Sequence, residues 1–169
     1  MEHWFKMNLL AIDPGNEESA FVLYDTEHGE VIEFGKEENE DVLHMLDAMP
    51  DRWAFDHLAI EMIASYGMPV GETIFGTCLW IGRFVQMAAT GGCREPRGHS
   101  LVYRSEVKVH LCGTMKAKDS NIRQRLIDIF GPGKSKAIGV KNAPGPLYKM
   151  KSDEWQALAV AVTFAERKG

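Results

Sequence analysis

The stretch Met7-Asn-Leu-Leu-Ala-Ile-Asp13-Pro-Gly-Asn16 is the part of the sequence that decides the fold. Its apolar run has the length of a buried strand, and Pro14-Gly15-Asn16 is a turn signal that ends the strand at a carboxylate. Two more strand patterns follow at Ser19–Asp25 and Glu30–Phe34, with a tight turn between them. The start of the chain therefore predicts a three-stranded antiparallel meander.

Helical and strand patterns alternate after this meander. Apolar residues recur at helical spacing from Val42 to Met49, and His57–Ile63 is a buried-strand pattern with one acid inside it. The remaining expected elements are a long helix, a short strand and three further helices, at Thr73–Ala89, Leu101–Tyr103, Glu106–Leu111, Asp119–Phe130 and Ser152–Glu166. This order predicts a single α/β domain over residues 1–169. Its mixed five-stranded sheet, the meander plus parallel strands, would be flanked by helices.

The segment 131–151 differs in composition from its surroundings. Its 21 residues include four Gly, three Pro and five Lys and little that could anchor it in a core, so we expect a flexible basic loop. Gly131-Pro-Gly-Lys-Ser135 superficially suggests a phosphate-binding loop. Asp128 stands where that motif needs a glycine, however, and a helix rather than a strand precedes it, so we reject this interpretation.

Charge is divided unevenly along the chain, whose formal net charge is −5. Residues 1–93 contain 4 Lys/Arg against 17 Asp/Glu, whereas residues 94–151 contain 13 against 4. Such asymmetry suggests a surface for a polyanion within an otherwise acidic protein. A solvated basic stretch would have the same composition.

The cysteines and the hydropathy limit the class of protein. Cys78, Cys93 and Cys112 lie far apart and form no CxxC pair, which argues against zinc and favours a reducing compartment. Neither a secretory start nor a run of about 18 apolar residues is present. We therefore expect a cytoplasmic protein with no membrane partner.

Asp13 and Glu61 are unusual because each is charged at an otherwise buried strand position. A buried ionised carboxylate must be paired, lie at an opening or bind a cation. If the first and fourth strands are neighbours, the two acids lie together, and Asp153 in the first turn of the last helix could complete the cluster. For Asp153 alone, helix capping is the alternative.

Three hard oxygen donors with no sulfur or imidazole nearby predict Mg²⁺ rather than zinc, with Mn²⁺ able to substitute. Such sites bind phosphate through the metal. With two ions per site, one would activate water and the other would stabilise the leaving oxygen of a phosphodiester.

These residues resemble the motifs of RuvC-type Holliday-junction resolvases, in order over most of the chain. Ala-Ile-Asp13-Pro-Gly resembles the first strand and metal aspartate of that family, and Leu-Ala-Ile-Glu61 its fourth-strand glutamate. Asp153-Glu-Trp-Gln-Ala-Leu-Ala resembles the final motif Asp-x-x-Asp-Ala-Leu-Ala. Gln156 stands at the second aspartate of this motif, where its amide oxygen could still touch the site, so the fourth metal position stays open.

The resemblance extends to a DNA-facing segment. Tyr103-Arg-Ser-Glu-Val-Lys108 and Gly113-Thr-Met-Lys-Ala-Lys118 are similar to that segment, and the matched Lys108 and Lys118 would hold DNA phosphates. Lys116 and Arg123 are neighbours of the same sign. Contacts of this kind give salt-sensitive affinity without reading sequence. Solvation of a helix face is the alternative for Arg123.

Two other features gain a role from the resemblance. Tyr66 lies just past Glu61, where the family presents an aromatic residue that wedges or stacks at the junction; a packing role is the alternative. The helix Thr73–Ala89 corresponds to the dimer-forming helix of the family, although core packing within one subunit would explain the same apolar stripe.

The resemblance implies a ribonuclease-H-like fold and a Mg-dependent endodeoxyribonuclease of bacterial or phage-infected cells. It would act as a homodimer that cuts four-way DNA junctions symmetrically and leaves a 5′-phosphate. A broader branched-DNA nuclease, acting on flaps and Y-forks, and a non-catalytic junction-binding protein on the same fold are the alternatives. A sugar-kinase-like nucleotide binder is disfavoured by the length of the chain and by the missing phosphate loops.

Overall fold

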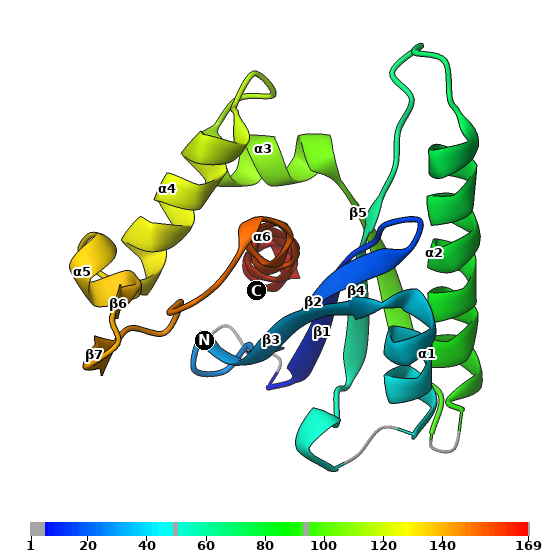
Figure 1. Ribbon diagram of the computed structural model, residues 1–169, viewed down its shortest axis with the longest axis horizontal. Helices are drawn as coiled ribbons and strands as arrows, with labels where there is room; N and C mark the ends of the chain where they lie inside the picture. The colour runs from blue at the N-terminus through cyan, green and yellow to red at the C-terminus, as the bar shows by residue number, and fades with distance from the viewer. Residues whose placement is uncertain (1–5, 49–50, 93–94, 169) are drawn as a thin grey trace.

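The computed structural model describes residues 6–48, 51–92 and 95–168. A five-stranded sheet with the strand order β3-β2-β1-β4-β5 forms the middle layer (Figure 1). The antiparallel meander consists of β1 (Asn8–Asp13), β2 (Glu18–Asp25) and β3 (Glu30–Glu38). On the other side of β1, β4 (His57–Met62) and β5 (Gly98–Tyr103) add in parallel. The predicted mixed sheet is confirmed.

β1 is the central strand, and its side chains alternate between two hydrophobic cores. Leu9 and Ala11 belong to one core, and Leu10 and Ile12 belong to the other. All four are at most 2% exposed, which explains why the strand is apolar on both faces. The same alternation directs Asp13 to the face of Leu9 and Ala11.

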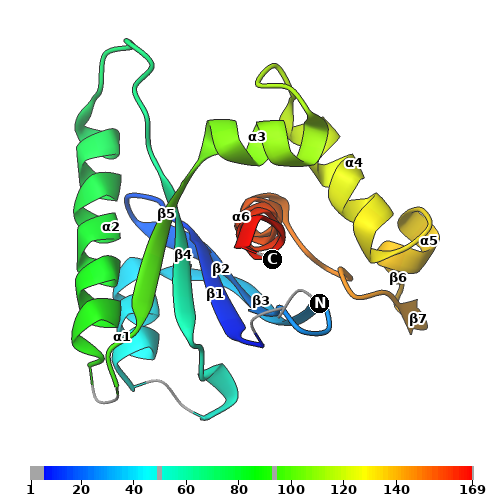
Figure 2. The same ribbon diagram turned by 180° about the vertical axis from the view of Figure 1, so that it is seen from behind.

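Helices cover both faces of the sheet (Figures 1 and 2). α1 (Asn39–Ala48) and α2 (Glu72–Thr90) cover one face, and the short helix η1 (Asp51–Trp53) precedes β4. α6 (Ser152–Lys168) covers the other face, with α3 (Arg104–Cys112) and α4 (Asp119–Phe130) packed against it. No helix within the described ranges is long and apolar enough to cross a membrane.

The segment 131–151 has more structure than its composition suggests. It contains the short helix α5 (Lys134–Ala137) and a two-stranded hairpin of β6 (Gly139–Val140) and β7 (Ala143–Pro144). Ala137 and Leu147 are fully buried in the α6-side core. The expectation that little anchors this segment is therefore wrong, because a few apolar side chains at wide spacing suffice when α4 and α6 already provide a surface.

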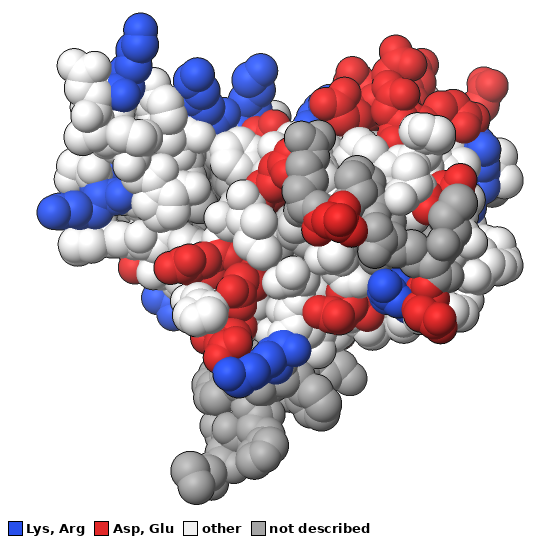
Figure 3. Space-filling model, turned by 90° about the horizontal axis from the view of Figure 1, so that it is seen from below, with Lys and Arg blue, Asp and Glu red and all other residues white. Residues whose placement is uncertain are grey.

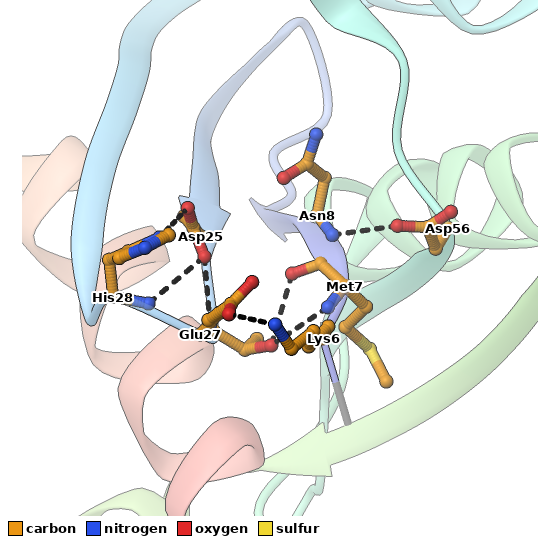
Figure 4. A network of polar contacts seen from close by, with 8 residues as sticks. Lys6, Met7, Asn8, Asp25, Glu27, His28 and Asp56 are labelled. Carbon is orange, nitrogen blue, oxygen red and sulfur yellow. Dashed lines mark hydrogen bonds and ion pairs between the residues drawn. The ribbon is translucent and has the colours of Figure 1, made fainter. Parts of the chain in front are cut away.

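A polar network secures the end of the sheet that lies opposite Asp13 (Figure 4). The backbone N–H of Asn8, the first residue of β1, donates to Asp56 Oδ2 at 2.7 Å. Asp25 at the end of β2 contacts the His28 ring, with 2.7 Å between Oδ2 and Nδ1. Hydrogen bonding and the charge of Asp25 raise the pKa of His28. The Thr26 N–H also donates to the Met7 carbonyl at 3.1 Å and links the β2–β3 turn to the start of β1. Together these contacts support the register on which the opposite end of the sheet depends.

Candidate active site

The pairing of β1 with β4 brings Asp13 and Glu61 together. In this parallel pair Ile12 lies opposite Ile60, so the next residues, Asp13 and Glu61, are neighbours at the carboxyl ends of their strands. Both follow an alanine of the α6-side core by two positions and therefore face α6. The sequence-based expectation that the first and fourth strands are neighbours is confirmed.

Burial and mutual repulsion disfavour the charged forms of these two acids. Burial, with added repulsion from Glu61 and Asp153, raises the pKa of Asp13 to about 8. Burial likewise raises the pKa of Glu61, against the opposing charge of Arg104. Glu61 Oε2 is buried and has no hydrogen-bond partner within the described residues. A cation between the carboxylates would relieve both the repulsion and this unsatisfied oxygen.

Asp153 reaches the cluster from the first turn of α6, where Lys36 binds it. Lys36 Nζ lies 2.8 Å from Asp153 Oδ2 and 3.0 Å from Glu18 Oε2. These hydrogen bonds, chiefly that to Asp153, raise the pKa of the Lys36 ammonium. Cross-strand pairing aligns Lys36 with Ala20 of β2 and Ala20 with Asp13, which places the lysine in the same row of the sheet.

Sequence reasoning missed Lys36. The predicted third strand ended at Phe34, because the apolar pattern stops there, whereas β3 continues to Glu38 through backbone pairing with β2. The local signal was weak: Lys36 is one of only four Lys and Arg residues among residues 1–93.

Arg104 is the second cation in the cluster that sequence reasoning did not single out. It is the first residue of α3, directly after β5, where the Tyr103 N–H donates to Glu106 Oε2 at 2.7 Å and caps the helix. Its Nη1 lies 3.6 Å from Glu61 Oε2 and also donates to Gln156 Oε1. Its Nη2 pairs with Asp119, the first residue of α4. One guanidinium thus joins three carboxylate or amide groups from β4, α6 and α4.

Gln156, the open fourth position, does lie beside the acid cluster. Asp153 and Gln156 are one helical turn apart and share a face of α6. The Gln156 amide oxygen accepts a hydrogen bond from Arg104. The one oxygen that this side chain could offer to a cation therefore faces a guanidinium.

The loop after Asp13 is held by two buried polar side chains, Ser19 and Asn39. Ser19 Oγ donates to Asn39 Oδ1 at 2.5 Å and accepts from the Gly15 N–H at 3.2 Å. Asn39 Nδ2 donates to the Gly15 carbonyl at 2.9 Å. Asn39 is the first residue of α1, so its side chain ties this loop to the start of that helix. Gly15 is required because a Cβ there would lie 2.4 Å from the Glu18 carbonyl oxygen.

The donor set of the cluster fits a hard divalent cation such as Mg²⁺. Asp13, Glu61 and Asp153 offer only carboxylate oxygens, and Glu61 has a buried oxygen with no hydrogen-bond partner within the described residues. As they lie, no three His, Cys, Asp or Glu side chains in the described ranges converge on one point that could hold an ion. Lys36 is bonded to Asp153 and would have to turn when an ion binds, whereas Arg104 lies 3.6 Å from Glu61 Oε2 and leaves that oxygen available.

The predicted DNA-contacting cations lie on α3, on α4 and on the loop between them. Lys108 is half-buried, and its charge acts on Glu61, which places it near the cluster. Lys116 and Lys118 are exposed. The Arg123 guanidinium lies 4.8 Å from the Trp155 ring centroid, so Arg123 stacks on α6 as well as facing solvent.

Charge is divided over the surface as well as along the chain (Figure 3). On the face that Figure 3 shows, most Lys and Arg side chains lie on the side of α4 and α5, and Asp and Glu side chains gather toward the upper right. A basic region therefore lies within an acidic protein, as the charge pattern of the sequence suggested.

Tyr66 is exposed in the loop between β4 and α2. Its side chain is 64% exposed, and its backbone is left-handed, with φ 47°. Met68 beside it is 73% exposed. A packing role for Tyr66 within this chain is therefore wrong, and its contact with DNA stays a prediction.

The apolar stripe of α2 divides between two faces. Ile81, Phe84 and Ala88 are buried against the sheet, whereas Phe75 and Leu79 are 63% and 68% exposed. Leu79 also lines a shallow groove of about 470 Å³ between α1 and α2. Core packing within the chain thus explains only part of the stripe.

A mixed sheet with clustered carboxylates at the carboxyl ends of β1 and β4 and α6 across them defines an α/β domain of the ribonuclease-H-like class. Neither a protein-family model nor a curated protein sequence matches the chain. Solved structures do match it, and they show that the fold is that of RuvC, as the resemblance implied.

Three solved structures illustrate the likeness. Thermus thermophilus RuvC matches with a TM-score of 0.66 at 16% identity, over 93% of this chain and 92% of its own. The same protein in complex with a Holliday-junction substrate gives 0.67 at 17%, over 94% and 93%. The yeast mitochondrial Holliday-junction resolvase Ydc2 gives 0.60 at 10%, over 96% and 81%. At these identities the likeness establishes the fold alone.

Proposed function

We propose that this protein is a metal-dependent endonuclease that hydrolyses phosphodiesters of four-way DNA junctions. The observation that carries the proposal is the pair Asp13 and Glu61, two buried acids side by side at the carboxyl ends of β1 and β4. Such a pair destabilises the fold unless a cation neutralises it, so its presence points to a functional role. The fold in which it lies is shared by RuvC and by the resolvase Ydc2.

The proposed mechanism assigns separate tasks to the acidic and the basic residues. Asp13, Glu61 and Asp153 would hold the divalent cation, which supplies an activated water and stabilises the charge on the phosphate. Lys108, on the side of Glu61, would bind the phosphate that enters the cluster. The buried contacts of Ser19 and Asn39 keep the loop after Asp13 in place, so that the aspartate does not swing away.

DNA beyond the scissile phosphate would be bound by the exposed cations and by Tyr66. Lys116, Lys118 and Arg123 would contact phosphates without reading sequence. Tyr66 would stack on an unpaired or distorted base at the junction centre. A four-way junction offers such bases and two symmetric strands, which suits a homodimer with one site per chain.

Cleavage of a labelled synthetic four-way junction in Mg²⁺ or Mn²⁺ tests this proposal. Linear duplex and a Y-fork of the same sequence serve as substrate controls. The wild-type protein should make paired symmetric nicks in the junction. Asp13→Asn should retain junction binding and lose about a thousandfold in rate, equivalent to roughly 4 kcal/mol of activation free energy.

The pattern of cleavage separates the related functions. If the Y-fork is cut as fast as the four-way junction, the proposed substrate class widens to branched DNA in general. If the junction is bound tightly but stays intact with Mg²⁺ and with Mn²⁺, the result would contradict the proposed nuclease activity and indicate a junction-binding protein.

A further inference from the structure

The acid cluster contains a fixed positive charge of its own. The Arg104 side chain is only 21% exposed and contacts Glu61, Gln156 and Asp119 from three different elements. A guanidinium stays protonated at any pH that the folded protein tolerates. Its contacts to a helix start and to α6 hold it at the Glu61–Gln156 end of the cluster.

Gln156 and Arg104 together make the Glu61–Gln156 end of the cluster less negative than two carboxylates would make it. A glutamine is neutral, and its amide oxygen already accepts a hydrogen bond from Arg104. A cation placed between Glu61 and Gln156 would therefore meet a single carboxylate, that of Glu61, and the guanidinium that lies 3.6 Å from it, and the two positive charges would repel each other at short range. At the Asp13–Asp153 end, Lys36 lies 2.8 Å from Asp153 Oδ2. Its side chain is 39% exposed, against 21% for Arg104, and it also pairs with Glu18, so it can turn away from an entering cation.

We propose that each chain binds a single divalent cation among Asp13, Glu61 and Asp153, and that the Arg104 guanidinium supplies the positive charge that a second cation would otherwise supply. This inference rests on the proposed function and changes the number of ions expected from sequence. The charges agree with it, because one divalent cation and one guanidinium balance three carboxylates, while Lys36 is balanced by Glu18, which it also contacts. Asp119, the other partner of Arg104, is 70% exposed at its side chain, so water screens it.

The arrangement also assigns a task to Arg104 during cleavage. A guanidinium has a planar set of donors that matches two phosphate oxygens. When phosphate enters the cluster, Arg104 exchanges the Gln156 oxygen for a phosphate oxygen and stays beside Glu61. Its positive charge thereby stabilises the negative charge that develops on the phosphate during cleavage.

Counting bound Mn²⁺ tests the proposal. The electron paramagnetic resonance signal of free Mn²⁺ is followed while the ion is titrated into the full chain, alone and with a synthetic four-way junction. The wild-type protein should bind one Mn²⁺ per chain in both cases. The double variant Arg104→Gln/Gln156→Asp should bind two. Arg167→Gln removes an arginine that pairs with Glu106 outside the cluster, and should bind one.

Two or no Mn²⁺ ions on the wild-type chain with the junction, or a single ion on the double variant, would overturn the proposal. Far-ultraviolet circular dichroism of each variant ensures that the counts come from folded protein. Gln156→Asp alone keeps Arg104 and should still bind one ion, which checks that the guanidinium, and not the amide, limits the number.

Cleavage rates provide a second readout. Arg104→Gln should lower the rate about a hundredfold, the typical effect of removing one charge-stabilising donor, and the double variant should recover most of that loss. A rate unchanged in Arg104→Gln would overturn the role in cleavage. A wild-type chain that binds one Mn²⁺ but cuts no junction would instead refute the proposed function and leave the ion count intact.

Discussion

At the scale of single residues, Asp13 shows how a site opposes the stability of the fold that contains it. Its carboxyl group is buried beside two other acids, and its pKa is raised to about 8 from an ordinary value of 3.8. In the unfolded chain the group loses its proton above about pH 4, whereas the folded protein retains it to about pH 8. Between these values the folded state binds more protons, so stability falls as pH rises.

Asp13→Asn should therefore stabilise the metal-free protein. With EDTA present, the free energy of unfolding of the wild type should fall between about pH 4 and about pH 8, and that of the variant should fall less. The difference near pH 8 should be about 2 kcal/mol, after allowance for partial solvent access. Urea unfolding across this range measures it.

The exposed Asp41→Asn on α1 is the matched control and should follow the wild type. Added Mg²⁺ should raise the stability of the wild type more than that of Asp13→Asn, because only the carboxylate binds the ion. Parallel pH profiles for the wild type and Asp13→Asn would contradict the raised pKa.

At the scale of elements, the contacts between the β1–β2 loop and the start of α1 determine where Asp13 points. Ser19 and Asn39 are buried and satisfy each other and the backbone of Gly15. The Asn39 N–H also donates to the Glu17 carbonyl at 2.8 Å. The loop is thus tied to a helix as well as to its own strands.

Asn39→Ala should destabilise the protein by about 2–3 kcal/mol, because it leaves the Ser19 hydroxyl and the Gly15 carbonyl without their partner in a dry environment. It should also weaken the stabilisation by Mg²⁺, since this loop directly follows Asp13 and holds it in place. Thermal unfolding with and without Mg²⁺ measures both effects.

Asn16→Ala removes an exposed amide from the same loop and should change neither quantity. A loss of stability in Asn39→Ala with an undiminished Mg²⁺ effect would show that the loop does not position the aspartate.

At the scale of the whole molecule, the basic and apolar surfaces lie on different sides of the sheet. The cations of α3 and α4 lie on the α6 side, whereas Phe75 and Leu79 project from α2, which covers the opposite face. Exposed large apolar side chains on a regular helix are typical of an interface. We propose that a second copy of the chain occupies this surface, because symmetric cleavage of a four-way junction, the proposed function, would need two sites.

Leu79→Glu should convert a dimer into monomers. Burying a charge against an identical helix is strongly unfavourable, so the dissociation constant should rise at least a hundredfold. Sedimentation equilibrium measures the mass of each species. On a four-way junction, the variant should make single nicks instead of paired ones.

Val140→Glu, in the β6–β7 hairpin, is a matched control because Val140 is similarly exposed, at 64%. It should leave the mass unchanged. A wild-type chain that sediments as a monomer at micromolar concentration, with and without junction, would contradict the dimer.

The sequence by itself was sufficient for the order of the five sheet strands and the longer helices along the chain, and for the two unusual acids. Alternating and helical apolar patterns record which faces are buried, so β1, β4, α2 and α6 could be located from local information. A charge inside a buried strand is conspicuous for the same reason, and thus Asp13 and Glu61 were found before their contacts were known. The extra length of β3 and the fold of segment 131–151 could not be predicted from the sequence. The end of β3 is formed by backbone pairing, and the segment is anchored by widely spaced apolar residues, so neither has a periodic apolar pattern.

Only the tertiary structure revealed the cations beside these acids and the exposed part of α2. Lys36 contacts Asp153, and Arg104 contacts Glu61, although the two residues of each pair lie far apart in sequence. No sequence pattern near Lys36 or Arg104 predicts these contacts. Phe75 and Leu79 have the same spacing as the buried residues of α2, so their exposure depends on where α1 and the sheet end. Local apolar periodicity specifies helices and strands, but the contacts between their side chains depend on how elements distant in sequence pack together.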